Sequence, residues 1–423
     1  MRENILSQDL LDSAKQVLYG NLKIGFSRWA GTDYKYVSPS RLHYPHQWFW
    51  DSCFHTIVLS HLDIDLAKNE IRNLLKGQLA NGFIPHIIFW DRRGLAQPWE
   101  PLESKPSLAP KTTQLMQPPL LAEAVAAIYQ KDKDWKFLKE VLPKVAYYYR
   151  RLAETRDPDG DGLISIIAPY ESGMDQSPSY DPILGVSSSS AISEALMGRT
   201  VTFRNMMRAY NLEKIFAADY FNVEDVLVNS IYIRNLNILT NLLQEIDRED
   251  EARYFHKLAI KAKQSLIENC YDRQEGFFYD RFGKDHQYSR VKTVKGLMPL
   301  ILDLPKTITE RLVKKHLTNK DEFDLSFPIP TVARNEPSFS AQPPMLFREP
   351  IIWRGPTWIN TNWYLWKGLE EHGYKKEAES IKEVSIDLIR RNGFREFFNP
   401  LTGEGYGTHN FSWSTLVVDM LLS

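Results

Sequence analysis

The sequence predicts an all-α protein made of stacked helical hairpins, and three observations predict it. Apolar residues recur at three- and four-residue spacing along most of the 423 residues, as in PPLLAEAVAAIYQK at 118–131. Short connectors alternate with long loops between these stretches, as expected for helices that fold back on one another. Alternation typical of strands is scarce. Its best example is YDRQEGFFYDRF at 271–282, which reads as a small hairpin turning at Glu275-Gly276.

The helical periodicity places the elements in order along the chain. We expect helices at 5–18, 49–62, 64–79, 118–131, 133–156, 188–210, 223–246, 248–270, 292–303, 306–318, 354–372, 374–391 and 409–422. The long loops at 20–47, 80–117, 157–187, 319–353 and 392–408 hold most of the Trp, Gly and Pro. We expect these loops to form one working face. No Ser/Gly linker or low-complexity segment divides the chain, so residues 1–423 are expected to form a single domain.

The composition of the chain excludes some classes of function. Lys+Arg is 52 and Asp+Glu is 53, giving a formal net charge of -1, and no long block of like charges occurs, so we expect no nucleic-acid partner and no membrane partner. The first residues, MRENILSQDLLDSAKQ, lack the apolar core of a signal peptide, and we expect a cytoplasmic protein. Cys53 and Cys270 are too few for a disulfide framework. Composition leaves the oligomeric state open. The eleven Trp suit the flat faces of sugars as well as a large core.

Two motifs that precede helices carry candidate sugar-binding residues. The motif YPHQWFWD supplies Tyr44, Trp48, Trp50 and Asp51. Asp51 could equally cap the helix that follows, because a carboxylate in the first turn satisfies free backbone N–H groups. The second motif runs from His86, in NGFIPH, to Gln117, in TQLMQPP. A lone histidine is more often a packing or hydrogen-bonding residue than a metal ligand, so no metal site is assigned to His86.

The segment DPDGDG at 157–162 resembles a calcium-binding loop in its spacing of acidic residues. Such a loop closes with a bidentate glutamate, and Ala168 stands at that position. A turn is therefore the better interpretation, and we expect no metal site in the chain.

Two further segments contain candidate acid/base carboxylates. Asp175 lies in PYESGMDQSP, a Gly- and Pro-bearing loop in which an apolar environment would raise the pKa of a carboxyl toward neutrality. Glu396 lies among aromatic residues in FREFFNP, whereas Glu404 sits between two glycines and looks like an exposed turn residue. The motif WRGPTW contributes Trp353 and Trp358 as candidate pocket walls, and its Arg354 is a candidate for either a structural ion pair or substrate contact.

Taken in order, these motifs resemble glycoside hydrolase family 63, from about Tyr44 to Trp413. The similarity is strongest to short bacterial members such as mannosylglycerate and glucosylglycerate hydrolases. It implies an (α/α)6 toroid, an inverting mechanism and no cofactor, with Asp175 as general acid and Glu396 as general base. It also implies a sugar pocket lined by Tyr44, Trp48, Trp50, Asp51, Gln117, Trp353 and Trp358. Members often have Tyr where this chain has Ile352, which leaves part of the pocket wall different.

The resemblance implies a small α-glucoside or α-mannoside as substrate, with glucosylglycerate and mannosylglycerate as candidates. A glycerate leaving group needs a cation for its carboxylate, and Arg199, Arg204 and Arg208 are candidate sources. Two alternatives remain open. A toroid sugar isomerase or epimerase would depend on histidines rather than carboxylates, and a non-catalytic carbohydrate-binding protein would bind sugar without hydrolysing it.

Overall fold

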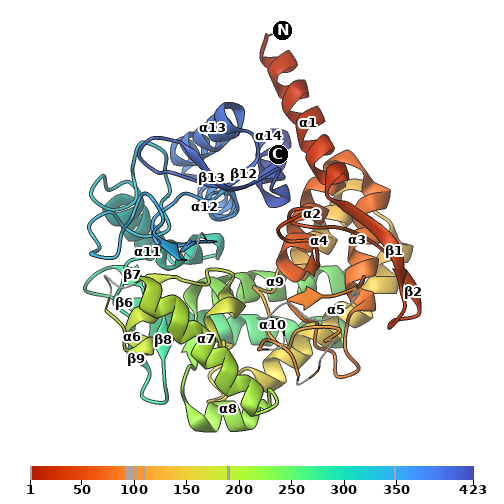
Figure 1. The fold of residues 1–423 in the computed structure, drawn as a ribbon, viewed down its shortest axis with the longest axis horizontal. Coiled ribbons are helices and arrows are strands. Elements are labelled where there is room, and N and C mark those ends of the chain that lie inside the picture. The colour runs from red at the N-terminus through yellow and green to blue at the C-terminus, as the bar shows by residue number, and fades with distance from the viewer. Residues whose placement is uncertain are drawn as a thin grey trace.

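The computed structural model describes residues 2–91, 100, 102–105, 107, 110–187, 191–346 and 349–423, and helices dominate it (Figure 1). The longer helices are α1 (Arg2–Gly20), α2 (Phe49–Leu62), α3 (Ile64–Lys76), α4 (Leu121–Asp132), α5 (Trp135–Thr155), α7 (Ala191–Met207), α9 (Val226–Gln244), α10 (Glu249–Ser265), α12 (Ile359–Glu371) and α13 (Lys375–Asn392). The shorter ones are α6 (Asp181–Leu184), α8 (Leu212–Ala218), α11 (Lys306–Arg311), α14 (Val417–Leu422) and the 3₁₀ helices η1 (Pro169–Ser172), η2 (Pro178–Tyr180), η4 (Val294–Ile301) and η6 (Ser412–Leu416). The all-α prediction is confirmed.

An inner ring of helical elements lies at the centre of the molecule. Going round it, α2 contacts α4, α4 contacts α9, α9 contacts η4, η4 contacts α12, α12 contacts η6, and η6 contacts α2. These elements are buried on nearly every side: every residue from Phe49 to Ser60 is buried, and so is every residue of η4. A helix buried all round needs neighbours on each side, and the closed ring supplies them.

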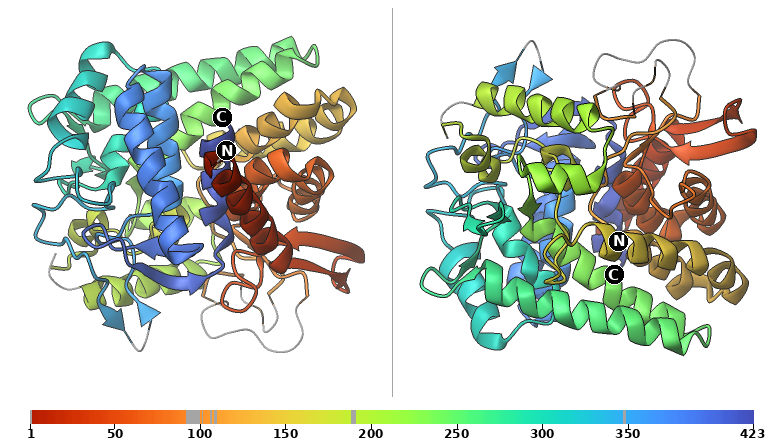
Figure 2. Two further views of the ribbon diagram at one scale, coloured as in Figure 1. Left: turned by 90° about the horizontal axis from the view of Figure 1, so that it is seen from above. Right: turned by 90° about the horizontal axis from the view of Figure 1, so that it is seen from below.

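An outer helix follows each inner element and packs outside it. The pairs are α2 with α3, α4 with α5, α9 with α10, η4 with Leu312–Leu317, which continues α11, and α12 with α13. The outer helices bury one face only, as amphipathic helices do. The ring closes through α1, which packs on η6 and α14, so the first and last helices lie together (Figure 2). This arrangement is the (α/α)6 toroid that the sequence predicted.

Loop lengths separate the two ends of the toroid. Each inner element is left by a short connector, such as Asp63 alone between α2 and α3 or residues 133–134 between α4 and α5. Each inner element is entered from a long segment, such as 77–120 before α4 or 318–358 before α12. All candidate site residues lie in the long segments or in the first turn of the inner helix that follows, which places them at one end of the ring.

Short antiparallel pairs of strands lie within the segments that connect the helices. They are β1 (Leu22–Ser27) with β2 (Thr32–Val37), β3 (Gln47–Trp48) with β4 (Ile87–Ile88), β5 (Val223–Glu224) with β8 (Arg281–Phe282), β8 with β9 (Gln287–Tyr288), β6 (Tyr271–Asp272) with β7 (Phe277–Phe278), β10 (Met345–Leu346) with β11 (Glu349–Pro350), and β12 (Arg395–Phe398) with β13 (Gly405–His409). The pairing of β6 with β7 confirms the hairpin predicted at 271–282.

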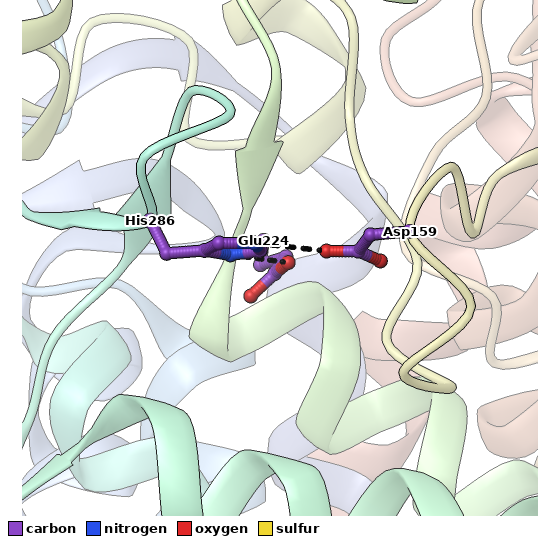
Figure 3. A group of neighbouring side chains, drawn as sticks. All are labelled: Asp159, Glu224 and His286. Carbon is purple, nitrogen blue, oxygen red and sulfur yellow. Dashed lines mark ion pairs between the residues drawn. The ribbon is translucent and has the colours of Figure 1, made fainter.

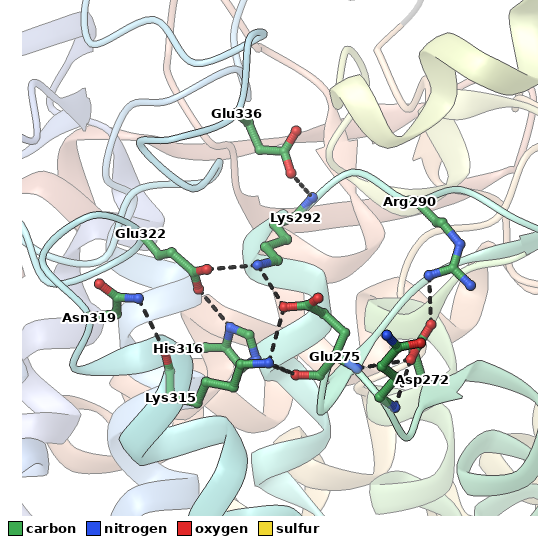
Figure 4. A network of polar contacts seen from close by, with 10 residues as sticks. Asp272, Glu275, Arg290, Lys292, Lys315, His316, Asn319, Glu322 and Glu336 are labelled. Atoms are coloured by element: carbon green, nitrogen blue, oxygen red, sulfur yellow. Dashed lines mark hydrogen bonds and ion pairs between the residues drawn. The ribbon is translucent and has the colours of Figure 1, made fainter.

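A polar network fixes the turn of this hairpin to the helix that follows η4 (Figure 4). Lys292 Nζ lies 3.1 Å from a carboxylate oxygen of Glu275 and 2.7 Å from one of Glu322. The other Glu322 oxygen contacts His316 Nδ1 at 2.6 Å. The network fastens a segment before η4 to the residues after α11, on the rim of the toroid.

Several predicted boundaries are wrong in an informative way. The helix predicted at 354–372 begins only at Ile359, because Thr357 forms bridges to Pro330 and Phe398 instead of a helical turn. The helix predicted at 292–303 is the 3₁₀ helix η4, which contains Pro299. Two predicted loops, 20–47 and 392–408, each contain a β-hairpin. The start of the helix predicted at 188–210 lies outside the described residues, and α8 follows it unpredicted.

The buried apolar residues form one contiguous cluster that extends from Leu10 to Met420. A core shared by the first and last helices is what one domain requires, and we propose on this ground that residues 1–423 form a single domain. Among the described residues, no helix has the length and apolar character needed to cross a membrane.

Candidate active site

Glu396 lies on β12 at an irregularity that aims its carboxylate. In the hairpin, Arg395 pairs with His409 and Phe397 pairs with Tyr406, so Gly407 and Thr408 together oppose the single residue Glu396. Gly407 has a φ of 66°, which matches a β-bulge whose first residue is glycine in the left-handed region. A Cβ on Gly407 would lie 2.5 Å from Glu396 Oε2, so only glycine fits there. The bulge thus makes room for the carboxylate.

Both oxygens of Glu396 accept hydrogen bonds. The Tyr44 hydroxyl donates to Oε1 at 3.1 Å, and the Thr408 backbone N–H donates to Oε2 at 2.9 Å. Glu396 is 5 % exposed, and this burial raises its pKa above the usual value, while the donors Thr408 and Tyr44 act in the opposite direction. The side chain is therefore a buried carboxyl held in a fixed orientation by two donors.

Asp175 lies just after η1, on a loop shaped by glycine. Gly173 ends η1 with a φ of 70°, and a Cβ there would lie 2.5 Å from the Trp50 ring. Helix α2 thus packs directly beneath the loop through Trp50. Asp175 itself is only partly exposed, and its pKa is raised to about 7. Burial is the largest cause, the charges of Glu103 and Glu396 act in the same direction, and Arg199 opposes them. A carboxyl of this kind keeps a proton near neutral pH.

Two buried ion pairs anchor this loop at its ends. At its start, Arg156 donates two hydrogen bonds of 2.7 Å to the carboxylate of Glu171. Glu171 also accepts a hydrogen bond from the backbone N–H of Met116 at 2.9 Å. At its end, Arg354 donates two hydrogen bonds, of 3.0 and 2.7 Å, to the carboxylate of Asp181. Because the Arg354 guanidinium is committed to Asp181, the geometry favours the ion-pair alternative for Arg354 over direct contact with substrate.

Asp51 brings a third carboxyl to the same place. It is 3 % exposed in the first turn of α2, and burial raises its pKa well above the usual value, with further increases from the charges of Glu396 and Asp175. These effects mean that the three carboxyls lie close enough for their charges to interact, although they come from sequence positions more than a hundred residues apart. Gln117 supports this turn, since its side-chain oxygen accepts the Trp50 backbone N–H at 3.1 Å.

Stacked indoles form one wall near Glu396. The rings of Trp353 and Trp358 lie 3.7 Å apart and nearly parallel, Trp358 stacks on Phe397 at 4.9 Å, and Trp413 meets Trp358 at 5.5 Å. Among the described residues, the indole nitrogens of Trp48, Trp358 and Trp413 are buried without a hydrogen-bond partner. Buried donors are normally satisfied, so these three unsatisfied N–H groups are candidates for hydrogen bonds to a ligand.

A polar group around His86 lies near Asp175, since the charges of two of its members, Glu103 and Arg199, act on that carboxyl. His86 Nδ1 contacts the Thr113 hydroxyl at 2.8 Å, and its Nε2 lies 3.5 Å from Glu103. Glu103 accepts Arg199 at 2.7 Å, and the guanidinium carbon of Arg199 lies 4.5 Å from the centre of the Tyr170 ring.

Among the three arginines suggested for a glycerate carboxylate, Arg199 is the one whose charge acts on Asp175. The guanidinium groups of Arg204 and Arg208 instead lie over the ring of Tyr220, at 4.3 and 4.8 Å.

Some contributors to the site had no sequence signal of their own. Glu103 lies in a long loop without a motif, and Gly407 and Thr408 act through a bulge that sequence alone does not reveal. Trp413 stood in the last aromatic segment, but only the contacts of its ring with Trp50 at 5.1 Å and with Trp358 place it at the site. A single Trp between serines gives no direction for its ring.

A helical toroid with paired, partly buried carboxyls and aromatic walls on its long-loop face defines the class of (α/α)6 glycoside hydrolases. A family model described as the mannosylglycerate hydrolase MGH1-like glycoside hydrolase domain matches residues 44–414, and the chain belongs to this family. It is therefore a glycoside hydrolase, which supersedes the isomerase and non-catalytic alternatives. The predicted resemblance to glycoside hydrolase family 63 is confirmed.

Similar proteins agree with this assignment. The chain is 30% identical over 408 residues to a mannosylglycerate hydrolase of Thermus thermophilus, covering 90% of this chain and 94% of that protein. It is 25% identical over 420 residues to the glucosylglycerate hydrolase of Mycolicibacterium hassiacum, covering 89% of this chain and 91% of that protein. The crystal structure of a family 63 mannosylglycerate hydrolase from Thermus thermophilus with Tris and D-glycerate matches with a TM-score of 0.84 at 27% identity, covering 98% of this chain and 100% of that one.

Proposed function

We propose that the protein hydrolyses an α-glycosidic bond with inversion, using Asp175 as general acid and Glu396 as general base. The observation that carries this proposal is the contrast between the two carboxyls. Burial raises the pKa of Asp175 to about 7, so this group can donate a proton near neutrality. Glu396 is buried but accepts hydrogen bonds from Tyr44 and Thr408, which stabilise its ionised form.

The roles follow from the chemistry of inversion. Two carboxyls roughly 6.5–9.5 Å apart leave space for one water between the base and the anomeric carbon. Asp175 would protonate the departing glycosidic oxygen while Glu396 takes a proton from that water. Water then attacks from the face opposite the leaving group, so an α-glycoside gives a β-sugar. Each such group contributes about 10²–10⁴-fold to the rate.

Asp51 and the indole nitrogens fit the role of hydroxyl binding. The raised pKa of Asp51 means that its carboxyl can donate as well as accept. Together with the unpartnered N–H groups of Trp48, Trp358 and Trp413, it offers directed polar contacts between apolar ring faces. That combination suits a single sugar ring, whose faces are apolar and whose rim carries hydroxyls.

We further propose mannosylglycerate or glucosylglycerate as the substrate. The named relatives act on these compounds, and Arg199 places a positive charge next to the acid Asp175, where the leaving group would depart. Arg199 donates to Glu103 through one nitrogen at 2.7 Å and its side chain is 42% exposed, so, unlike the doubly paired and buried Arg354, it can also meet a carboxylate of the substrate. Ile352, next to Trp353, is where the pocket wall departs from the common pattern of the family.

Two buried free cysteines fit the predicted cytoplasmic location, which cell fractionation would test.

The test is hydrolysis of both glycerates and of a panel of α-mannosides and α-glucosides, followed by proton NMR, which resolves the anomers. The wild type should release the β-sugar first. Asp175→Asn and Glu396→Gln should each remain folded and lose about 10²–10⁴-fold in turnover. Glu404→Gln, an exposed carboxylate eight residues after Glu396, is the matched control and should keep its activity. Near-wild-type turnover in either active-site variant would refute the assignment, and a first-formed α-sugar would refute inversion.

A further inference from the structure

Glu103 is a buried carboxylate beside the candidate active site, and it takes no part in the acid/base steps proposed above. Its side chain is 4% exposed. Arg199 Nη1 donates to Glu103 Oε1 at 2.7 Å, and His86 Nε2 lies 3.5 Å from the other oxygen, Oε2. Both oxygens therefore have a partner, and the carboxylate lies between helix α7 and the long segment that precedes α4.

The backbone around Glu103 is fixed by the same two parts of the chain. The Gln114 backbone N–H donates to the Glu103 carbonyl at 2.7 Å, in the segment before α4. The Tyr210 hydroxyl, which follows α7, donates to the carbonyl of Leu102. The loop therefore holds the carboxylate in one place.

Helix α7, which carries Arg199, is fixed against the loop of Asp175. The helix contacts η2 and α6, which follow Asp175 in the chain. On the other side of that loop, Asn205 Nδ2 donates to the carbonyl of Ile167 at 2.7 Å, just before η1. The guanidinium carbon of Arg199 lies 4.5 Å from the centre of the Tyr170 ring, on η1 itself. The cation is thus held against the loop from both ends.

A histidine contact alone does not distinguish Glu103 from other acidic residues. The ring nitrogens of His286 lie 3.3 Å from Asp159 and 3.4 Å from Glu224, which reach it from separate segments (Figure 3). Within the part of the chain that the structure describes, neither of these two carboxylates has a lysine or arginine within 4.0 Å. The pairing with Arg199 is therefore the feature of Glu103 that needs an explanation.

The two charges of this pair act on Asp175 in opposite directions. Glu103 raises the pKa of Asp175, and Arg199 lowers it. Two further carboxyls face the same group: Glu396 raises its pKa as well, and Asp51 interacts with its charge. An arginine beside an acid favours the ionised form, which has no proton to donate. Glu103 offsets that effect of Arg199.

We propose that Glu103 is a positioning residue that fits the site to an anionic leaving group: it holds Arg199 beside Asp175 and balances its charge until a substrate carboxylate does so. This proposal rests on the function proposed above. One nitrogen of Arg199 pairs with Glu103 while 42% of its side chain is exposed, so a second carboxylate can reach the guanidinium. An anionic leaving group then adds negative charge beside Asp175, whereas a neutral one adds none.

NMR titration of the Asp175 carboxyl in full-length protein tests this balance without any turnover, with isotope-labelled aspartate and with Asp175→Asn to assign the signal. Glu103→Gln should move the titration midpoint to lower pH by about one pH unit or more, because Arg199 is then unopposed. Arg199→Gln should move it to higher pH, and the double variant should return toward the wild type. A folding defect would not give opposite shifts that cancel. Glu140→Gln, which removes a carboxylate that accepts Arg72 at 2.6 and 2.7 Å on an outer helix, is the matched control and should keep the wild-type midpoint.

Two ligands test whether a carboxylate can replace Glu103. Saturating D-glycerate should return the Asp175 midpoint of Glu103→Gln toward the wild-type value, whereas glycerol should leave it low. The kinetic counterpart uses a glycerate conjugate and the matching glycerol conjugate of the same sugar. In Glu103→Gln the basic limb of kcat/KM should move to lower pH with both, but the limb of kcat should move only with the glycerol conjugate.

Three results would overturn the proposal: an unchanged Asp175 midpoint in Glu103→Gln, shifts in the same direction in the two single variants, or equal effects of glycerate and glycerol. A wild type that hydrolyses neither conjugate would instead contradict the proposed function, and the NMR titration would still decide the role of Glu103.

Discussion

Removing one oxygen atom, in Tyr44→Phe, tests the hydrogen bond that orients Glu396, the proposed general base. The Tyr44 ring packs edge-on against Trp48 at 6.0 Å and Phe411 at 5.8 Å, and phenylalanine keeps both contacts. What is lost is the 3.1 Å hydrogen bond from the hydroxyl to Glu396 Oε1. A hydrogen bond to a charged group contributes about 1.5–3 kcal/mol. At about 1.4 kcal/mol for each factor of ten, the expected loss in kcat/KM is roughly 10–150-fold.

The pH profile distinguishes this effect from a general structural one. The Tyr44 hydroxyl donates to the carboxylate and so lowers the pKa of Glu396, and its removal raises that pKa. Because the base acts when deprotonated, the acidic limb of the kcat/KM profile should move to higher pH in Tyr44→Phe, with the largest loss at acid pH.

A matched control for Tyr44→Phe exists at the opposite end of the toroid. There the Tyr129 hydroxyl donates to Glu245 at 2.8 Å, and Tyr129→Phe should leave the profile unchanged. A shift of the acidic limb to lower pH, or equal losses in the two variants, would refute the orienting role of Tyr44.

Two further predictions concern the loop of Asp175, the proposed general acid. Arg354→Ala leaves Asp181 buried without its cation and should lower the free energy of unfolding by about 3–5 kcal/mol, as measured by urea denaturation, while the exposed-surface variant Arg253→Ala should change it little. For Asp175, the folded-state pKa of about 7 lies above the ordinary value of 3.8, so the folded protein favours the protonated form, and the stability this gives at low pH is lost as pH rises through that interval. Asp175→Asn should therefore raise Tm at pH 8 and change it little at pH 3, and a lower Tm at pH 8 would contradict the raised pKa.

Local periodicity predicted the helices well wherever helical packing alone decides the structure. Helix α2 begins and ends where the sequence indicated, at 49 and 62, because apolar residues recur at helical spacing along it and Asp63 then caps α3. Periodicity failed where distant backbone segments compete for the same residues. Thr357 delays α12 by bridging to two other segments. The hairpin that carries Glu396 pairs strands of four and five residues, too short to show alternation against a helical background.

The candidate carboxylates could be predicted from their aromatic neighbours, but their supports could not. Asp175 and Glu396 stood out because Gly, Pro and aromatic residues surround them in the sequence. Glu103 and Thr408 act on them through contacts that tertiary structure creates. Pairings of this range depend on the topology of the whole ring, which no local pattern encodes.

The buried carboxylates of the described residues fall into two groups. In one group, ion pairs or hydrogen bonds within the framework of the fold stabilise the negative charge, and the other group lies at the candidate active site. Glu171, Asp181 and Asp225 each have a cation at 2.7, 2.7 and 2.6 Å, and Glu70 has hydrogen bonds from Ser52 and Val37. In the same described residues, Asp51, Asp175 and Glu396 have no ion pair within 4.0 Å, although each is shielded enough for its pKa to rise. A fixed cation would hold these groups ionised and unable to move a proton. The absence of an ion pair is compatible with the acid/base roles that we propose for Asp175 and Glu396, and the ion pairs of Glu171 and Asp181 hold the loop that carries Asp175.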